Sequence, residues 1–81
     1  MQKLYKRYID VIVRTNKNGE QTPKQVIWEN GTGYSIDKII DVERRASRVG
    51  GCGLCYTCVI SGVVRYLYLE KNRWFIESHQ P

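Results

Sequence analysis

Residues 54–77 read LCYTCVISGVVRYLYLEKNRWFIE, and two short turns divide this stretch into three segments with alternating apolar residues. Ser61 and Gly62 are typical of a two-residue hairpin loop, because glycine readily adopts the positive φ that such loops need. Lys71 and Asn72 fit a second loop of this kind, because asparagine tolerates a left-handed conformation. The stretch therefore predicts three antiparallel strands joined by two tight turns.

The two turns place one set of residues on the same side of the predicted sheet. Counting back from the first turn sets Leu54 opposite Leu69. Counting from the second turn sets Trp74 opposite the same Leu69. It also sets Ile76 opposite Leu67. Successive side chains alternate across a strand, so both turns predict one inner face. That face holds Leu54, Tyr56, Cys58, Ile60, Val63, Leu67, Leu69, Trp74 and Ile76, and the outer face carries Cys55, Thr57, Val59, Val64, Tyr66, Tyr68, Phe75 and Glu77.

Three further strands are predicted upstream, around two glycine-containing turns. The Asn-Gly pair at 18–19 is a strong hairpin signal, and a two-residue loop there sets Val11 opposite Val26. A three-residue loop within the Asn-Gly-Thr-Gly run at 30–33 sets Val26 opposite Ile36. Both turns again bring apolar residues together, which predicts a sheet with one continuous apolar side.

The third of these strands is predicted over residues 34–43, with Ile36, Ile40 and Val42 facing inward. A lysine interrupts the alternation after Ile36, so a bend or bulge is expected beside it. A helix over residues 35–47 is the alternative, because some apolar residues in that run also have helical spacing.

Six short strands without a convincing long helix are typical of a closed antiparallel sheet, because closure removes exposed sheet edges. We therefore expect an all-β fold, a small antiparallel SH3-like barrel of five to six strands joined by tight hairpins. An OB-like barrel is the alternative, although its usual helix is missing. The chain, 1–81, is expected to form a single domain, with a long basic loop at about 44–53 and a frayed tail at 78–81.

Two segments carry a resemblance to a known group of proteins. Residues 26–42 read VIWENGTGYSIDKIIDV and contain a W-x-x-G-x-x-Y pattern, and residues 56–77 read YTCVISGVVRYLYLEKNRWFIE and contain R-W-F near their end. Together they resemble short uncharacterised bacterial proteins with an SH3-like barrel. The resemblance implies the fold, and it carries no activity, cofactor or functional residue over to numbered positions.

Length and composition indicate a small soluble domain. Folding buries only about 60% of the surface of a chain this short, so a roomy enclosed active site is not expected. A hydrophobic content of 42% with 26% charged residues argues against general disorder. The start, MQKLYKRYID, is too polar for a signal peptide, and no apolar run is long enough to span a membrane. We therefore expect a cytoplasmic protein without membrane association, in which the cysteines are reduced.

The formal net charge is +5, and its positive residues are concentrated in one region. Between residues 44 and 69 the chain has four arginines and no acidic residue. Arginines interleaved with aromatic residues are typical both of protein interfaces and of surfaces that bind single-stranded nucleic acid. The candidate binding residues are Arg44, Arg45, Arg48, Arg65, Tyr66, Tyr68 and Phe75. We expect a non-enzymatic binding module that uses an aromatic outer face for protein interaction or self-association, with nucleic-acid binding through the arginines as the alternative.

The spacing of Cys52, Cys55 and Cys58 is that of metal ligands, and His79 could in principle complete a zinc site. However, the predicted register sends Cys55 and Cys58 to opposite faces of one strand. No metal and no cofactor are therefore predicted. Catalysis is not expected either, because the chain has one histidine and scattered carboxylates rather than titratable groups gathered in a pocket.

Overall fold

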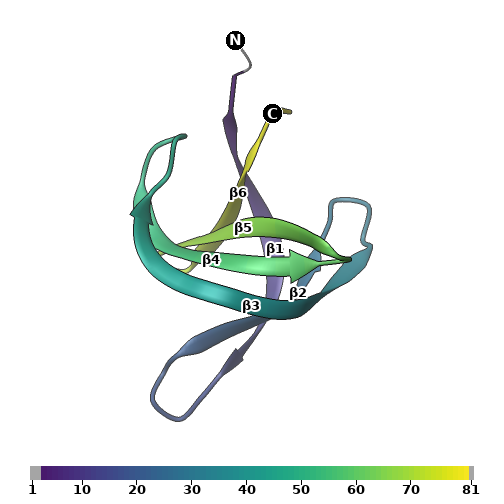
Figure 1. Cartoon of the computed structure of the whole chain (residues 1–81), viewed down its shortest axis with the longest axis vertical. Helices are drawn as coiled ribbons and strands as arrows, with labels where there is room; N and C mark the ends of the chain where they lie inside the picture. The colour runs from purple at the N-terminus through teal and green to yellow at the C-terminus, as the bar shows by residue number, and fades with distance from the viewer. Residues whose placement is uncertain (1–2, 81) are drawn as a thin grey trace.

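The computed structural model describes residues 3–80 and contains six antiparallel strands that close into a barrel in chain order (Figure 1). The strands are β1 (Tyr5–Thr15), β2 (Gln21–Ile27), β3 (Gly33–Ala46), β4 (Cys52–Ile60), β5 (Val63–Glu70) and β6 (Arg73–Ser78). The all-β prediction is confirmed, and the arrangement is consistent with a small SH3-like barrel. The helical alternative for residues 35–47 is wrong, because β3 runs through that segment as a strand. Among the described residues, no helix has the length and apolar character needed to cross a membrane.

The three C-terminal strands pair in the predicted register. Leu54 lies opposite Leu69, and Leu69 lies opposite Trp74. Both residues of the turn at 61–62 have a positive φ, as a two-residue hairpin with matching twist requires. In the second turn the left-handed residue is Lys71, with a φ of 57°, rather than the asparagine that was expected.

The inner face of the barrel forms the main hydrophobic core. Its buried members are Val26, Tyr56, Cys58, Leu67 and Trp74, surrounded by the partly buried residues Ile9, Val11, Val13, Ile36, Ile39, Leu54, Ile60, Leu69 and Ile76. The ring centroids of Tyr56 and Trp74 lie 5.1 Å apart, and the Tyr56 hydroxyl donates to the backbone carbonyl of Gln21. Of the inner-face residues predicted for the C-terminal strands, only Val63 lies outside this core, because it sits beside a turn and is 47% exposed.

β1 is shared between two neighbours, which explains its length of 11 residues. Its first half pairs with β6 and its second half with β2. The predicted pair of Val11 with Val26 is confirmed, although the connecting turn is longer than the two-residue loop expected. The turn spans residues 16–20, where the Asn16 side chain accepts two backbone amide hydrogen bonds. A one-residue bulge at Lys24 offsets the longer turn and restores the pairing.

The predicted register between β2 and β3 is wrong by two residues. Val26 lies opposite Tyr34 and not opposite Ile36, because the connection is longer than the three-residue loop expected. The connection runs from Trp28 to Thr32, where a hydrogen bond of 2.9 Å from the first amide to the last carbonyl closes it. A shift by an even number of residues keeps each side chain on its expected face, so Ile36 still packs inward.

β3 is the longest strand, with 14 residues, and two bulges bend it. The first bulge lies beside Lys38, where a bend was predicted, and the second follows Ile39. Together they bring Ile39 to the core and leave Ile40 unpaired and 53% exposed, so the prediction that Ile40 faces inward is wrong. Val42 lies opposite the core residue Tyr56, on the predicted face, although it is 45% exposed.

The connection between β3 and β4 is shorter than the predicted loop at 44–53. The two strands extend into that segment from both sides and leave a turn at 47–51, which backbone hydrogen bonds of 3.1 and 3.2 Å close. β6 includes Ser78, the first residue of the predicted tail, because Ser78 pairs with Tyr5. The last residue of that tail, Pro81, lies outside the described residues.

Candidate functional site

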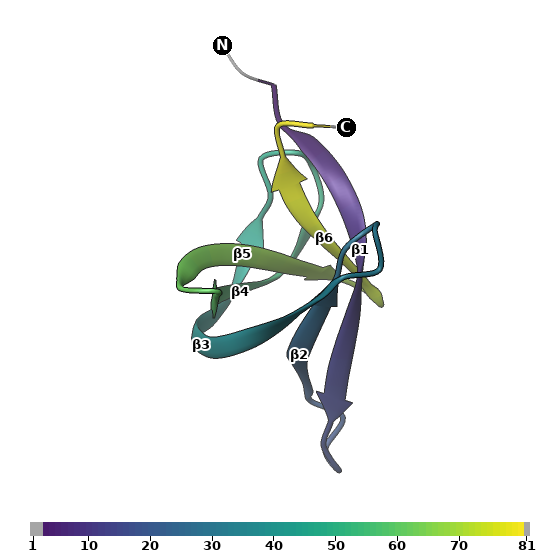
Figure 2. The ribbon, with the colours of Figure 1, turned by 90° about the vertical axis from the view of Figure 1, so that its right-hand side faces the viewer.

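β5 and β6 separate shortly after the turn that joins them. They pair only over residues 68–70 and 73–75, so the predicted pair of Leu67 with Ile76 is absent. β6 then continues along β1, while β5 remains paired with β4 over residues 63–69. Figure 2 shows the two strands diverging from their common turn. The barrel is therefore open between the unpaired parts of β5 and β6.

The free edge of β5 presents backbone groups that have no partner strand among residues 3–80. In an antiparallel ladder, alternate residues hydrogen-bond to one neighbour and the intervening residues face the other. The tight turn at 61–62 directs the backbone groups of Val63 and Arg65 toward β4. The N–H and C=O groups of Val64 and Tyr66 therefore point to the side from which β6 has departed.

A groove of about 650 Å³ follows this open edge. Side chains from both faces of β5 and of β6 line it, as expected where two strand edges border a space. The lining includes the core residues Val26 and Leu67 and the exposed residues Val64, Arg65 and Tyr66. The groove thus joins an apolar interior to a polar rim.

Arg65 is the charged residue at the centre of the free β5 edge. It lies opposite Cys58, and its side chain lines the groove. Within the part of the chain that the structure describes, Arg65 forms no ion pair. The acidic residue that lines the same groove, Glu77, is already engaged, because its carboxylate accepts hydrogen bonds from Ser47 and Tyr68. The positive charge of Arg65 is therefore available to a partner.

β3 also has an unpaired edge, beyond its short pairing with β2 at residues 33–35. That edge carries features by which proteins protect sheet edges, namely two bulges and many charged side chains. The charged residues are Asp37, Lys38, Asp41, Glu43, Arg44 and Arg45. The β5 edge has no bulge and carries one charged residue among apolar neighbours, since residues 63–67 read VVRYL. β5 is therefore the edge that is open to another strand.

Two of the predicted surface residues are buried, which corrects the expectation of an aromatic outer face. Tyr68 and Phe75 are 3% and 1% exposed, and their stacked ring centroids lie 5.0 Å apart. With Cys55 they form a second small core on the outer side of the sheet, against which Val49 packs. The expectation failed because the turn at 47–51 folds back over the sheet, which the alternation of residues does not reveal.

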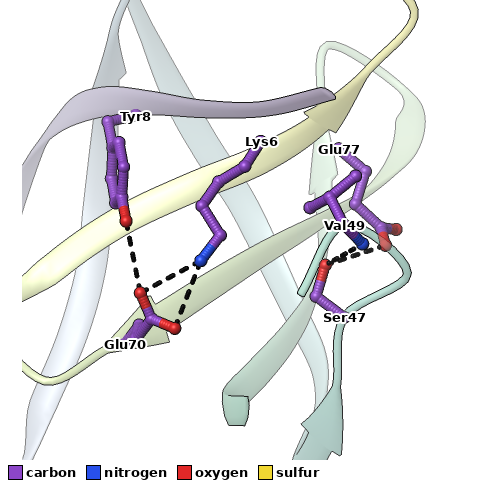
Figure 3. Close-up of polar contacts among 6 residues, drawn as sticks. All are labelled: Lys6, Tyr8, Ser47, Val49, Glu70 and Glu77. Carbon is purple, nitrogen blue, oxygen red and sulfur yellow. Dashed lines mark hydrogen bonds and ion pairs between the residues drawn. The ribbon is translucent and has the colours of Figure 1, made fainter. Parts of the chain in front are cut away.

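Two carboxylates hold the covering turn and the neighbouring strands in place (Figure 3). Glu77 accepts a hydrogen bond of 3.0 Å from the Ser47 hydroxyl. Glu70 forms an ion pair of 3.2 Å with Lys6 and accepts a hydrogen bond from the Tyr8 hydroxyl. The hydrogen bond from Lys6 is the main cause that lowers the pKa of Glu70. The outer cluster is therefore part of the structural framework and leaves no free aromatic surface at this place.

The four arginines predicted to bind a partner do not form one patch. Arg44 and Arg45 are exposed on β3, and Arg48 is exposed on the covering turn. The guanidinium carbon of Arg45 lies 5.4 Å from the ring centroid of Tyr66, so these two predicted residues do meet. Arg65 lies four residues further along β4 than Arg44, or about 13 Å at the usual rise per residue, and on the other side of that strand.

The three cysteines are free thiols, and two of them pack in the interior. Cys55 lies in the outer cluster and Cys58 in the main core, so the predicted placement on opposite faces is confirmed. Burial raises the pKa of both thiols, that of Cys58 to about 11, and both therefore stay protonated at neutral pH. Within residues 3–80, no three His, Cys, Asp or Glu side chains gather as metal ligands would.

The groove was not predicted from the sequence, because the ladder between β5 and β6 was expected to continue to a pair of Leu67 with Ile76. A signal for it exists in residues 63–67, where both faces of the strand carry large side chains. In such a strand, the fold of one small sheet buries the side chains of one face, and those of the other face remain available for contacts with another segment. Comparison with models of known protein families gave no match, and comparisons with curated proteins and with solved structures gave none either.

Proposed function

We propose that this chain is a non-enzymatic binding module that takes an extended segment of another protein into the groove, as an added strand along β5. The observation that carries this proposal is the free backbone edge at Val64 and Tyr66 beside an apolar groove. In strand addition, main-chain hydrogen bonds supply affinity and side-chain contacts supply specificity. The groove offers both kinds of contact along one line.

The distribution of exposed apolar residues supports this choice of surface. Val63, Val64 and Tyr66 are each close to half exposed, and all three border the groove. A hydrophobic edge of this kind is a liability unless a partner covers it. The partner is expected in a reducing compartment such as the cytoplasm, which suits a chain whose three cysteines are free thiols.

Nucleic-acid binding through the arginines is the second candidate, and the proximity of Arg45 to Tyr66 favours it. An exposed aromatic ring beside an arginine can stack on a base while the guanidinium pairs with phosphate. Arg44 is adjacent in β3 but lies opposite Leu54, on the other face of the sheet, and Arg65 does not join the pair either. Such binding would involve the outer face of β3 and β5 and would meet the groove only at Tyr66.

A display library of random heptapeptides, screened against the immobilised chain, tests the proposal. We expect selected peptides to be rich in β-branched and aromatic residues, and to shift the NMR amide signals of Val64 and Tyr66 on titration. Val64→Pro should abolish binding, because proline removes a backbone donor on the free edge. Val64→Thr, which keeps the donor, is the matched control and should bind.

Two outcomes would favour other conclusions. Peptide binding that survives Val64→Pro unchanged would exclude strand addition to β5. Titration with a single-stranded thymidine oligonucleotide provides the comparison for the second candidate. Shifts centred on Arg45, with an affinity that falls steeply as salt is added, would support nucleic-acid binding instead.

A further inference from the structure

We infer that the groove selects a segment with an acidic residue opposite Arg65 and an apolar residue two positions to either side of it. This inference rests on the proposed function and adds the chemistry of the partner. Three features lead to it: the place of Arg65 in the ladder, the residues that flank it on the same face, and the engagement of the neighbouring carboxylate.

The place of Arg65 in the ladder makes its side chain the one that a partner strand meets most closely. A strand added antiparallel to β5 would form hydrogen-bonded pairs at Val64 and Tyr66, whose backbone groups face the groove. Arg65 lies between them and would therefore occupy a non-hydrogen-bonded pair. In such pairs the Cα atoms are only about 4.5 Å apart and the side chains are closest. The residue opposite Arg65 therefore contacts the Arg65 side chain, and its charge affects the affinity of the partner strand.

The flanking positions favour apolar residues. On the same face as Arg65, two residues away in each direction, lie Val63 and Leu67. Leu67 belongs to the main core and Val63 is half exposed, so a partner residue opposite either one meets apolar surface. A charged residue there would lose water without gaining a partner.

A carboxylate is the group that complements Arg65. The guanidinium forms no ion pair with the residues that the structure describes, and Glu77 is held by Ser47 and Tyr68. An acidic residue of the partner would therefore gain charge-assisted hydrogen bonds without displacing an existing pair. A lysine in its place would face a like charge at short distance.

The same geometry disfavours a second copy of this chain as the occupant. Two β5 edges related by a twofold axis pair residues whose numbers add to a constant. Only the register that pairs Val64 of one copy with Tyr66 of the other gives hydrogen-bond partners to the free backbone N–H and C=O groups of both residues in each copy. That register sets the two Arg65 side chains directly opposite one another, where like charges repel.

Three capped peptides test this inference: acetyl-Ser-Val-Thr-Glu-Thr-Val-Ser-amide and its versions with Gln or Lys at the centre. Each peptide has the same order of residues from either end. The central residue therefore lies opposite Arg65, and the two valines lie opposite Val63 and Leu67, whichever way the peptide runs along β5. We expect the Glu peptide to bind about fivefold more tightly than the Gln peptide, as for a partly exposed ion pair, and the Lys peptide to bind most weakly. In Arg65→Glu the order of the Glu and Lys peptides should reverse. Arg44→Glu makes the same change of charge outside the groove and should leave the order as in the parent chain.

The outcomes separate this inference from the proposed function. Equal affinities for the three peptides, with shifts at the Val64 and Tyr66 amides, would overturn the acidic preference and leave strand addition standing. A reversal in Arg44→Glu as large as in Arg65→Glu would show an effect of net charge and would also overturn it. If neither these peptides nor those selected from the library shift the two amides, the proposed function itself fails.

Discussion

The ring of Tyr68 on β5 stacks on the ring of Phe75 on β6 with their planes only 9° apart, on the opposite side of the sheet from the main core. The two residues are cross-strand partners at the last pair before the strands separate. The Lys6 ammonium lies 4.6 Å from the centroid of the Phe75 ring, and Val49 packs against the same cluster. The stack therefore marks the point at which the barrel stops closing and the groove begins.

The outer cluster should contribute to stability as a core does. Phe75→Ala should lower the free energy of unfolding by about 3 kcal/mol, because it removes a buried aromatic ring and leaves a cavity beside Tyr68. Tyr66→Ala, at a half-exposed position on the same face, should lower it by no more than about 0.5 kcal/mol. Equilibrium denaturation in urea measures both changes. Equal losses in the two variants would show that the cluster is not a core.

The Glu77 carboxylate should hold the covering turn closed. Glu77 accepts hydrogen bonds from the Ser47 hydroxyl and, at 2.8 Å, from the Arg48 backbone amide. Glu77→Gln should weaken these bonds, lower the free energy of unfolding by about 1 kcal/mol and speed hydrogen exchange at the amides of Arg48 and Val49. Glu29→Gln, at an exposed glutamate away from this turn, is the control. Unchanged exchange at Arg48 and Val49 would mean that other contacts hold the turn.

The pairing of the C-terminal strands could be predicted because the turns at 61–62 and 71–72 agree on one register. In that register Trp74 and the leucines share a face, and a slip of one residue at either turn would separate them. The connection between β2 and β3 could not be predicted in the same way. Loop lengths that differ by two residues keep every side chain on the same face, so the pattern cannot distinguish between Ile36 and Tyr34 as the partner of Val26.

The covered outer face could not be predicted from the alternation of residues. Alternation shows which side chains share a face, but it does not show whether a distant segment lies over that face. Gly53 illustrates the difficulty, because it resembled a loop residue and is in fact buried in β4. A side chain there would collide with the backbone carbonyl of Leu69. A glycine that permits close approach of two strands has the same appearance in a sequence as a glycine in a loop.

Acid should weaken the fold through Glu70. The hydrogen bond from Lys6, with a smaller contribution from Tyr8, lowers the pKa of Glu70 below its ordinary value of 4.5. A carboxyl with a lower pKa in the folded chain than in the unfolded chain adds stability above the unfolded value. This stability is lost as the pH falls through the folded pKa. In Glu70→Gln the fall of the thermal midpoint below pH 4.5 should be shallower, and identical pH profiles by circular dichroism would contradict this assignment.

Alkali should weaken the fold through the buried thiol of Cys58. Burial raises its pKa from 9.0 to about 11, so the unfolded chain loses this proton at a lower pH than the folded chain does. The resulting stability is present below pH 9 and is lost as the pH rises toward 11. Cys58→Val should make the decline of the urea midpoint over that range less steep. The decline will not disappear, because burial also raises the pKa of Cys55.

A steep alkaline decline that is the same in Cys58→Val would assign the effect to other groups. Thiol labelling gives a second test of the burial. At neutral pH a disulfide reagent should modify the exposed Cys52 at once, and should modify Cys55 and Cys58 only at the rate at which the chain unfolds. Three equally fast reactions would contradict the placement of the two inner thiols.

Arg65 should keep the free edges of two copies apart, so its removal should join them. Arg65→Val converts residues 63–67 from VVRYL to VVVYL and removes the like-charge contact in the register that pairs Val64 with Tyr66. We expect the parent chain to sediment as a monomer and the variant as a dimer. Hydrogen exchange at the Val64 and Tyr66 amides should be fast in the parent and slow in the dimer, because only the dimer pairs those groups.

Arg44→Val makes the same change at the other unpaired edge, on β3, and should leave the chain monomeric because bulges and charged neighbours still protect that edge. The comparison thus separates the loss of one positive charge from the loss of a charge at the free β5 edge. Dimers of both variants would assign the effect to net charge. An Arg65→Val chain that stays monomeric at high concentration, with fast exchange at both amides, would mean that the β5 edge cannot accept a strand of this sequence.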